Sequence, residues 1–526
     1  LKLPSFAGQG RRCTERLRQM MDSGGMVPQE VEEERASVNS ILLTTSLLIL
    51  IGVGYRINTH RLRHVPESGV AMLFGFAFGI AVRVLDLPQE ESILVFKNNV
   101  FFYGLLPPII FEAGLSLEAQ MFVDNLGSIA AFAVVGTLIS TWVVAEMLQW
   151  AAEWNMVGLD RTPLLGMHCY LFGALISATD PVATIALFGG SRFRTDPLLV
   201  SLINGEAVLN DAVAIVLFTT LQSVPSDKEP QIVSLPILGE FFAVSAGSLA
   251  VGLASGATCS WVFCRSRFLS RFPDYEISAM VLVAYLTFAL SQLLGLSGIM
   301  ALFFFGVVMA QYNWYNLSEH SKVASKVTFG TLAKLAESCV FLYLGVVAAL
   351  SISRFHWHAG LVFWSVVIII IARAAHIFPI TMLLNPFRTR KINTNMKVTL
   401  WVSGLRGAIA FALSLRIPCS RSGAKHGDVD CRNSDLLITT TVSIVAITTL
   451  VVGTAMEKVM MALNVIEPIE PSSSLDTPMS TPTLAAGSFS VPLASDSAGG
   501  LGSPIFGPGS PRAIRDAWQG GGPAAP

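Results

Sequence analysis

Long apolar runs, separated by short polar segments, cover most of the chain between residues 40 and 465. A helix needs about 20 mostly apolar residues to cross a bilayer, and this criterion predicts about thirteen spans. The predicted spans comprise residues 40–55, 66–85, 98–115, 126–149, 164–189, 198–222, 234–264, 276–291, 296–311, 328–351, 359–384, 397–416 and 436–462. The pattern therefore predicts an all-α polytopic membrane protein.

Helix-breaking residues interrupt three of these spans. Pro107-Pro108 falls inside the third span, Asp180-Pro181 inside the fifth, and two glycines flank Arg406 inside the twelfth. Proline lacks a backbone donor and disfavours helix at the residue before it. Interruptions in the fifth and twelfth spans are the pattern of two inverted six-span repeats that the seventh span joins. In transporters such breaks build ion sites, although a simple proline kink is the alternative interpretation of Asp180-Pro181.

Composition agrees with membrane insertion and divides the chain. Of the 526 residues, 52% are hydrophobic and 13% are charged, whereas soluble domains carry about 25% charged residues. The net charge of −1 gives no sign of nucleic-acid binding. Lys and Arg are more frequent in the loops after odd-numbered spans, which predicts that these loops and the C-terminus are cytoplasmic. We expect a polar N-terminal segment (1–39), a transmembrane domain (40–465) and a disordered tail rich in Pro, Ser and Gly (466–526).

Charged residues lie deep inside the predicted spans, and acids outnumber bases. The set comprises Glu112, Asp180, Glu206, Asp211, Glu337, Arg373 and Arg406. Such residues are functional, or they pair with one another. The two arginines can neutralise at most two of the five acids. The remaining acids need protons or cations, so the set favours a cation pathway.

Helix geometry separates the two acids of the sixth span. Glu206 and Asp211 are five residues apart, so their side chains project about 140° from each other around the helix. They cannot face the same partner. We expect Glu206 to pair with an arginine, either Arg373 or Arg406, and Asp211 to face something else.

At these residues the sequence strongly resembles the sodium/proton exchanger family of monovalent cation:proton antiporters. Six stretches, in the order found in the family, carry the resemblance: LLPPIIFEAGLSL, ALISATDPVATIALF, GEAVLNDAVAIVL, GIMALFFFGVVMAQY, ESCVFLYLGV and WVSGLRGAIAFALSLR. Phe111, next to Glu112, and the stretch HIFPITMLLNPFR are more similar to the organellar (Golgi/endosomal) branch than to the plasma-membrane branch. An endomembrane location is therefore favoured over the plasma membrane.

The resemblance implies a homodimer in membrane lipid, with thirteen spans and a six-helix core that moves as an elevator. It implies that Asp211 alternately binds a proton and a metal cation, Na⁺ or K⁺, beside Asn210, and that Asp180 and Thr179 complete the site. It also implies a salt bridge between Glu206 and Arg373. Arg406 and Glu337 match positions that lie near the core in the family. One stretch of this chain matches a segment that is linked to inhibitors in the family. It contains Pro107, Pro108, Phe111, Glu112, Gly114 and Leu115.

A single carboxylate suggests how the exchange would work. Burial disfavours the charged form of a carboxylate and a bound cation favours it, so Asp211 holds a proton or a cation. Because Asn210 is not a second acid, we expect electroneutral exchange. Many relatives have serine where this chain has Ala207, which leaves potassium transport open. The sequence contains no recognisable site for ATP or a redox cofactor, so gradients of Na⁺, K⁺ or Li⁺ and of H⁺ would drive transport.

Other interpretations compete with antiport. The chain could form a cation channel or an antiporter-like subunit of a larger complex. Asp180 and Asp211 could also form the dyad of an intramembrane aspartyl protease, although neither lies in a Gly-x-Gly-Asp context. Cys419 and Cys431 fall in a loop predicted to be luminal, where a disulfide or two free thiols are both open.

Overall fold

The computed structural model describes residues 29–60, 66–84, 100–117, 119–180, 184, 193–224, 235–266, 272–354, 357–418 and 429–468. All of its helices and strands lie in one compact unit, Leu1–Ile469. Most of the predicted N-terminal segment, and all of the predicted tail after Pro468, lie outside the described residues. Helix α2 begins at Gln29, before the predicted start of the first span at residue 40.

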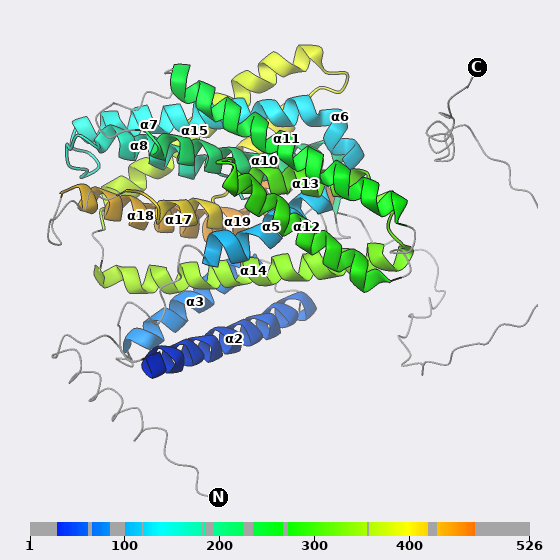
Figure 1. The fold of residues 1–526 in the computed structure, drawn as a ribbon. Coiled ribbons are helices and arrows are strands. Elements are labelled where there is room, and N and C mark those ends of the chain that lie inside the picture. Colours follow the sequence, from blue (N-terminus) through cyan, green and yellow to red (C-terminus); the bar gives the residue numbers. More distant parts are fainter. Residues whose placement is uncertain are drawn as a thin grey trace, which may run out of the picture. The chain divides into compact units, whose positions relative to one another are not determined.

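The described residues are almost entirely helical (Figure 1). The N-terminal half contains α2 (Gln29–His60), α3 (Glu67–Val84), η1 (Phe101–Leu105), α5 (Leu106–Ser116), α6 (Ala119–Ala130), η2 (Ala131–Val135), α7 (Gly136–Glu153), α8 (Leu165–Ser177), α10 (Pro197–Gln222) and α11 (Leu235–Arg265). The C-terminal half contains α12 (Pro273–Leu293), α13 (Gly298–Gln311), η4 (Asn313–Tyr315), α14 (Glu319–Arg354), α15 (Ala359–Leu384), η5 (Asn385–Phe387), α16 (Thr394–Val402), α17 (Ala408–Ser414), α18 (Val429–Ile447), η6 (Thr448–Val452) and α19 (Gly453–Ala462). Two short strands, β1 (Phe193–Thr195) and β2 (Ile466–Pro468), pair antiparallel.

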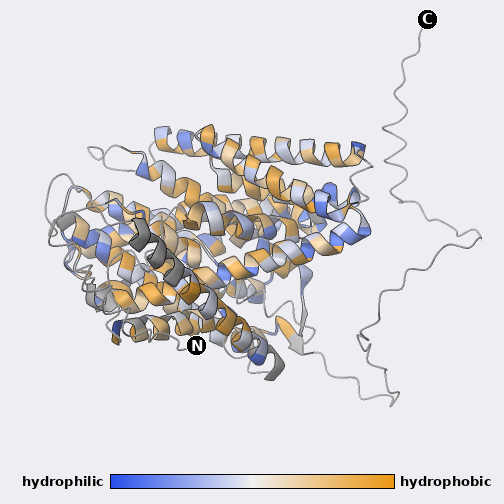
Figure 2. Ribbon diagram, turned by 60° about the horizontal axis from the view of Figure 1, so that its bottom comes forward, coloured by the Kyte–Doolittle hydropathy of each residue, from blue (hydrophilic) through white to orange (hydrophobic). Residues whose placement is uncertain are grey.

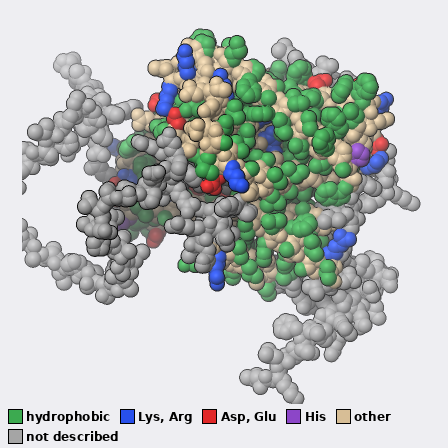
Figure 3. Space-filling model, turned by 180° about the vertical axis from the view of Figure 1, so that it is seen from behind, with side chains coloured by type: hydrophobic (Ala, Val, Ile, Leu, Met, Phe, Trp, Pro, Cys, Tyr) green, Lys and Arg blue, Asp and Glu red, His purple; other side chains and the backbone are tan. Residues whose placement is uncertain are grey.

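The helices present an apolar surface to their surroundings. Among the described residues, seven helices are long and apolar enough to cross a membrane, and four further apolar helices are shorter. In the apolar 18-residue stretches of α11 and α12, only 22% and 33% of the residues, respectively, are buried inside the protein. Hydrophobic side chains dominate the face in Figure 3, and hydrophobic colour runs along most helices in Figure 2. The protein is therefore an integral membrane protein, with lipid covering these apolar side chains.

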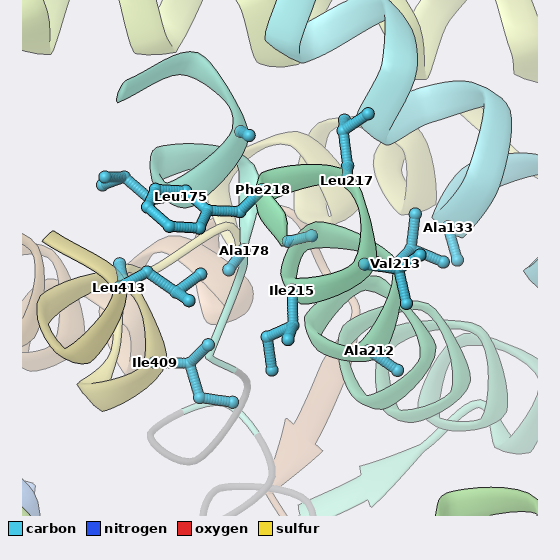
Figure 4. Close-up of a cluster of buried hydrophobic side chains, with 14 of the residues drawn as sticks. Ala133, Leu175, Ala178, Ala212, Val213, Ile215, Leu217, Phe218, Ile409 and Leu413 are labelled. Carbon is cyan, nitrogen blue, oxygen red and sulfur yellow. The ribbon is translucent and has the colours of Figure 1, made fainter. Parts of the chain in front are cut away.

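Of the seven described helices that are long and apolar enough to cross a membrane, α10 is the most buried, with 72% of its most apolar stretch inside the protein. Side chains of α8 and α17 pack against those of α10, as Figure 4 shows for Leu175, Leu413 and Phe218. All three of these side chains are fully buried. The polar residues of α10 are therefore held by a close-packed apolar core, in which small displacements are costly.

Pro107 and Pro108 do not break their helix, so the predicted interruption of the third span is wrong. The backbone is helical without a gap from Phe101 to Ser116. A π-helical turn, η1, precedes α5, and both prolines lie in the first turn of α5. The prolines therefore lie where the hydrogen-bond register changes from the π-helical turn to the α-helix, and the N–H of Leu106, just before them, donates to the carbonyl oxygen of Phe101.

Glycines allow α3 and α14 to approach until their backbones touch. A Cβ atom on Gly345 would overlap the carbonyl oxygen of Met72, and one on Gly75 would overlap the carbonyl oxygen of Leu342. Small residues at such crossings give membrane helices close van der Waals contact, which is a main source of their association. The α3–α14 pair is therefore joined backbone to backbone.

This contact predicts that Gly345→Ala destabilises the protein, because the new methyl group forces the two backbones apart. Overpacking of this kind typically costs about 1–3 kcal/mol. Gly330→Ala is the matched control, since a Cβ at Gly330 on the same helix meets nothing within 4 Å. Thermal melting in detergent measures both variants. Equal melting temperatures for the two would contradict the close approach.

Candidate functional site

Two interruptions of the helical backbone meet inside the protein. Helix α8 ends at Ser177, ahead of the Asp180-Pro181 dipeptide, and Ala178 has an extended ψ of 131°. On the other side, α16 ends at Val402 and α17 begins at Ala408. The backbone N–H of Asp180 donates to the carbonyl oxygen of Leu405 at 2.9 Å, which makes a one-residue antiparallel bridge.

The glycines around Arg406 provide the space for this crossing. A Cβ atom on Gly407 would overlap the carboxylate of Asp180. A Cβ on Gly404 would lie 2.5 Å from Nε of Arg373. Each glycine therefore accommodates one charged side chain from another segment. Figure 4 shows the neighbouring apolar side chains, with Ala178 at the end of α8 and Ile409 at the start of α17.

Asn210 ties α10 to the end of α8. Its Nδ2 donates to the carbonyl oxygen of Ser177 at 2.9 Å and to Oγ1 of Thr179 at 3.2 Å. Its Oδ1 accepts from Oγ1 of Thr137 on α7 at 2.7 Å. Asn210 and Thr179 are both buried. The amide is thus satisfied on both sides, which fixes its orientation in the low-dielectric interior.

Asp211, the next residue of α10, is half-buried. Asp180 and Arg406 are the charged groups that interact with it electrostatically. Among the described residues, no salt bridge neutralises this carboxylate. Two acids and the buried oxygens of Ser177 and Thr179 therefore surround the crossing, and oxygen atoms are the ligands that alkali cations accept.

Glu206 lies on another side of α10 and is neutralised. Nη1 of Arg373 on α15 is 2.6 Å from Oε1 of Glu206, and both side chains are buried. Nη2 of Arg373 also donates to the carbonyl oxygen of Leu400 at 2.9 Å. Of the two arginines that the sequence leaves open, Arg373 is the partner, in agreement with the pairing that the resemblance implies.

Arg406 occupies the break between α16 and α17. Its side chain is 1% exposed, and Nη1 donates to the carbonyl oxygen of Gly404 at 2.9 Å. Its backbone N–H donates to Oγ1 of Thr448 at 3.2 Å. Arg406 interacts electrostatically with both Glu206 and Asp211 without a salt bridge to either among the described residues. It supplies a fixed positive charge close to the two acids.

The other predicted site residues lie on neighbouring helices. Glu337 on α14 is half-buried and interacts electrostatically with Asp180 and with Glu112 on α5. Helix α5 packs mainly against α13 and α14. The residues on α5 that match the inhibitor region are Pro107, Pro108, Phe111, Glu112, Gly114 and Leu115.

The predicted disulfide is described only at one end. Cys431 is disulfide-bonded, so the free-thiol alternative is wrong for this residue. Cys419 lies outside the described residues, and its pairing with Cys431 stays a prediction.

The sequence pattern misses several residues of the crossing. Thr137 and Thr448 each hydrogen-bond a site residue, but hydroxyl residues are common in apolar helices and carry no distinguishing signal. Leu405 contributes only its backbone carbonyl, which no residue-type pattern reveals. The described residues contain no group of three His, Cys, Asp or Glu side chains that could hold a metal ion. Any cation at the crossing would therefore need backbone, amide or hydroxyl oxygens as well.

Interrupted helices that cross inside an apolar bundle, with carboxylates at the crossing, define the class of secondary transporters. The profile of the family described as "Sodium/hydrogen exchanger, transmembrane" matches residues 45–462. Sodium/hydrogen exchanger 8 of Rattus norvegicus is 37% identical over 438 residues, which cover 81% of this chain and 72% of the relative. Sodium/hydrogen exchanger 5 of Arabidopsis thaliana is 34% identical over 445 residues, covering 83% and 82%.

A solved structure agrees at the level of the fold. A sodium proton antiporter from Methanocaldococcus jannaschii superposes with a TM-score of 0.62 at 17% identity, covering 82% of this chain and 99% of that one. The chain therefore belongs to the transmembrane sodium/hydrogen exchanger family. It is a secondary transporter rather than an enzyme, so the aspartyl-protease interpretation of Asp180 and Asp211 is wrong.

The buried ion pair predicts that Glu206→Gln strongly destabilises the protein, because Arg373 is left as an uncompensated buried charge. Breaking such a pair typically costs about 3–5 kcal/mol. Glu67→Gln is the control, since its ion pair with Lys334 is exposed and contributes about 0–1 kcal/mol. Melting in detergent compares them, and exchanging the two charges of the buried pair should recover part of the loss. A wild-type melting temperature for Glu206→Gln would show that the pair is not structural.

Proposed function

We propose that this protein exchanges Na⁺ or K⁺ for H⁺ across a membrane, with Asp211 as the carboxylate that binds each in turn. The observation that carries the proposal is the contrast within α10. Glu206 is neutralised by Arg373, whereas Asp211 faces the crossing with no salt bridge among the described residues. Membership of the sodium/hydrogen exchanger family supports the same chemistry.

Competition at one carboxylate would couple the two ions. Removal from water disfavours the charged form of Asp211, so the free site takes up a proton or a cation. Either ligand cancels one negative charge, and Asn210 adds no second charge. Each movement of the site across the membrane then carries one positive charge, either a cation in one direction or a proton in the other. One full exchange cycle therefore moves no net charge. Asp180, Thr179 and nearby carbonyl oxygens such as that of Ser177 would provide the remaining cation ligands.

Alternating access would follow from movement of the helices that hold the crossing. We propose an elevator movement in a homodimer, built on thirteen spans in two inverted repeats. The paired interruptions, between α8 and α10 and between α16 and α17, support the repeat arrangement. We further propose a Golgi or endosomal membrane, with the C-terminus in the cytosol, on the basis of the organellar motifs and the basic loops.

Transport by purified protein in liposomes tests the proposal. Proton flux is recorded under imposed Na⁺, K⁺ and Li⁺ gradients, together with membrane current. Saturable exchange without current supports electroneutral antiport. Current through the protein would instead support the alternative of a cation channel or channel-like subunit.

One prediction of the proposed function concerns the carboxylate of Asp211. Asp211→Asn removes the charge that binds both ligands and keeps nearly the same shape, so exchange should fall to background while the protein still folds. Asp274→Asn, at an exposed residue in the first turn of α12, is the matched control and should exchange at the wild-type rate. A folded Asp211→Asn variant with near wild-type exchange would remove Asp211 from the mechanism.

The second prediction concerns ion preference. Ala207 is buried one helical turn before Asp211 and on the same side of α10. A hydroxyl added by Ala207→Ser should help Na⁺ more than K⁺, because Na⁺ loses more hydration energy on entry. We expect a lower apparent KM for Na⁺ and an unchanged one for K⁺, both measured at one pH.

Ala212→Ser serves as the control for this substitution, since Ala212 is equally buried on the same helix but points in another direction. An unchanged ratio of the two KM values in Ala207→Ser would contradict the ligand role of the added hydroxyl.

A further inference from the structure

Strand β2 lies directly after the last helix of the transmembrane unit and is tied to the start of α10. It pairs antiparallel with β1, with Ile466 opposite Thr195. The residue after Thr195 is Asp196, whose carboxylate accepts a hydrogen bond from the N–H of Leu198 at 2.9 Å and caps α10. Helix α10, which carries Asp211, therefore begins at Pro197, with only Asp196 between it and β1.

The chain turns sharply to reach this position. The N–H of Val465 donates to the carbonyl oxygen of Met460, and the N–H of Asn464 donates to that of Met461. Asn464 has a left-handed φ of 51°. These two bonds and this conformation form a Schellman motif, which ends α19 and reverses the chain. Nδ2 of Asn395 on α16 also donates to the carbonyl oxygen of Leu463 at 2.8 Å, so the turn is fixed from outside α19 as well.

The turn brings Ile466 into the apolar cluster of Leu405, the residue whose carbonyl oxygen bonds Asp180. Ile466 is 2% exposed and packs in one small apolar cluster with Leu405, Met456 and Met460. Leu405 is the residue whose carbonyl oxygen accepts the N–H of Asp180. A continuous set of contacts therefore runs from β2 through the side chain of Leu405 to the backbone of Asp180.

Leu405 depends on this packing more than a helical residue would. It lies in the irregular backbone between α16 and α17, where no helical ladder fixes its carbonyl group. Its own N–H donates to Ser403, only two residues back. Its side chain is buried in the cluster that contains Ile466 and the two methionines, and this burial restricts where its carbonyl can lie. Binding sites require their groups to be held within about 0.5 Å.

We propose that Ile466 is a positioning residue for the cation site, acting through Leu405 on the backbone bridge to Asp180. The effect on transport rests on the function proposed above. The inference extends the site to a segment that the sequence pattern assigns to a disordered tail. It also connects that segment, through β1, to the helix that carries the exchanging carboxylate.

The test compares three full-length variants with the wild type. Ile466→Ala removes most of the side chain that packs in the cluster with Leu405, and Ile466→Val removes one methylene group. Ile237→Ala, on α11, makes a similar loss at a buried residue outside this cluster and is the matched control. Apparent KM for Na⁺ and maximal rate are measured at one pH in liposomes, and melting temperature is measured in detergent.

We expect Ile466→Ala to raise the KM for Na⁺ several-fold with a smaller change in maximal rate, and Ile466→Val to raise the KM for Na⁺ by a smaller but measurable factor. Ile237→Ala should lower the melting temperature and leave the KM unchanged. An unchanged KM in Ile466→Ala, or an equal rise in Ile237→Ala, would overturn the proposal. If Ile466→Ala does not fold, the same comparison between Ile466→Val and Ile237→Val decides, and an unchanged KM in Ile466→Val overturns it.

Amide hydrogen exchange at Asp180 gives a readout that does not depend on transport. The N–H of Asp180 should exchange faster in the Ile466 variants than in the wild type and the Ile237 variants. Equal protection in all of them would overturn the positioning role even if transport differs. If the wild-type chain moves no ions, the proposed function fails, while faster exchange at Asp180 still supports the structural coupling.

Discussion

The hydrogen bond from the Asp180 N–H to the Leu405 carbonyl joins two places where the helical ladder is interrupted. An unpaired backbone group costs several kcal/mol at membrane depth, so an isolated break would be strongly unfavourable. Where two breaks meet, the donor of one satisfies the acceptor of the other. The crossing can then exist inside the apolar bundle. The surrounding residues serve this arrangement: Gly407 leaves room for Asp180, and Asn210 holds the end of α8.

Helix α10 carries two acids that have different surroundings on different sides of the helix. Glu206 is neutralised by Arg373 and contributes to the packing of α10, α15 and α16. Asp211 points elsewhere and has no salt bridge among the described residues. Because a spacing of five residues turns the second acid away from the first, one helix can carry both an acid that is paired and an acid without a salt bridge among the described residues. Arg406 adds a fixed positive charge that reaches both acids electrostatically.

The two discrepancies between sequence and structure have clear physical causes. Pro107-Pro108 predicts a break, but the π-helical turn η1 shifts the hydrogen-bond register just before these prolines, and the chain stays helical from Phe101 to Ser116. Residues 466–468 read as part of a polar tail, but Ile466 is buried and β2 pairs with β1. A strand of three residues is too short to show an alternating pattern. Its partner strand β1 lies far away in the chain, so the local sequence does not indicate the pairing either.

The sequence by itself predicted the class of protein: apolar runs and intramembrane acids favour a membrane protein with a cation pathway, and six stretches carry the resemblance to the exchanger family. Asp180-Pro181 and the glycines around Arg406 also locate the two breaks that meet. It also determined that Glu206 and Asp211 diverge, since helical periodicity is a local property. Only the tertiary structure decided that Arg373 is the partner of Glu206, that the carbonyl of Leu405 accepts the N–H of Asp180, and that Ile466 packs in the same apolar cluster as Leu405. These are contacts between segments distant in the chain, and they depend on backbone atoms and shape rather than on residue type.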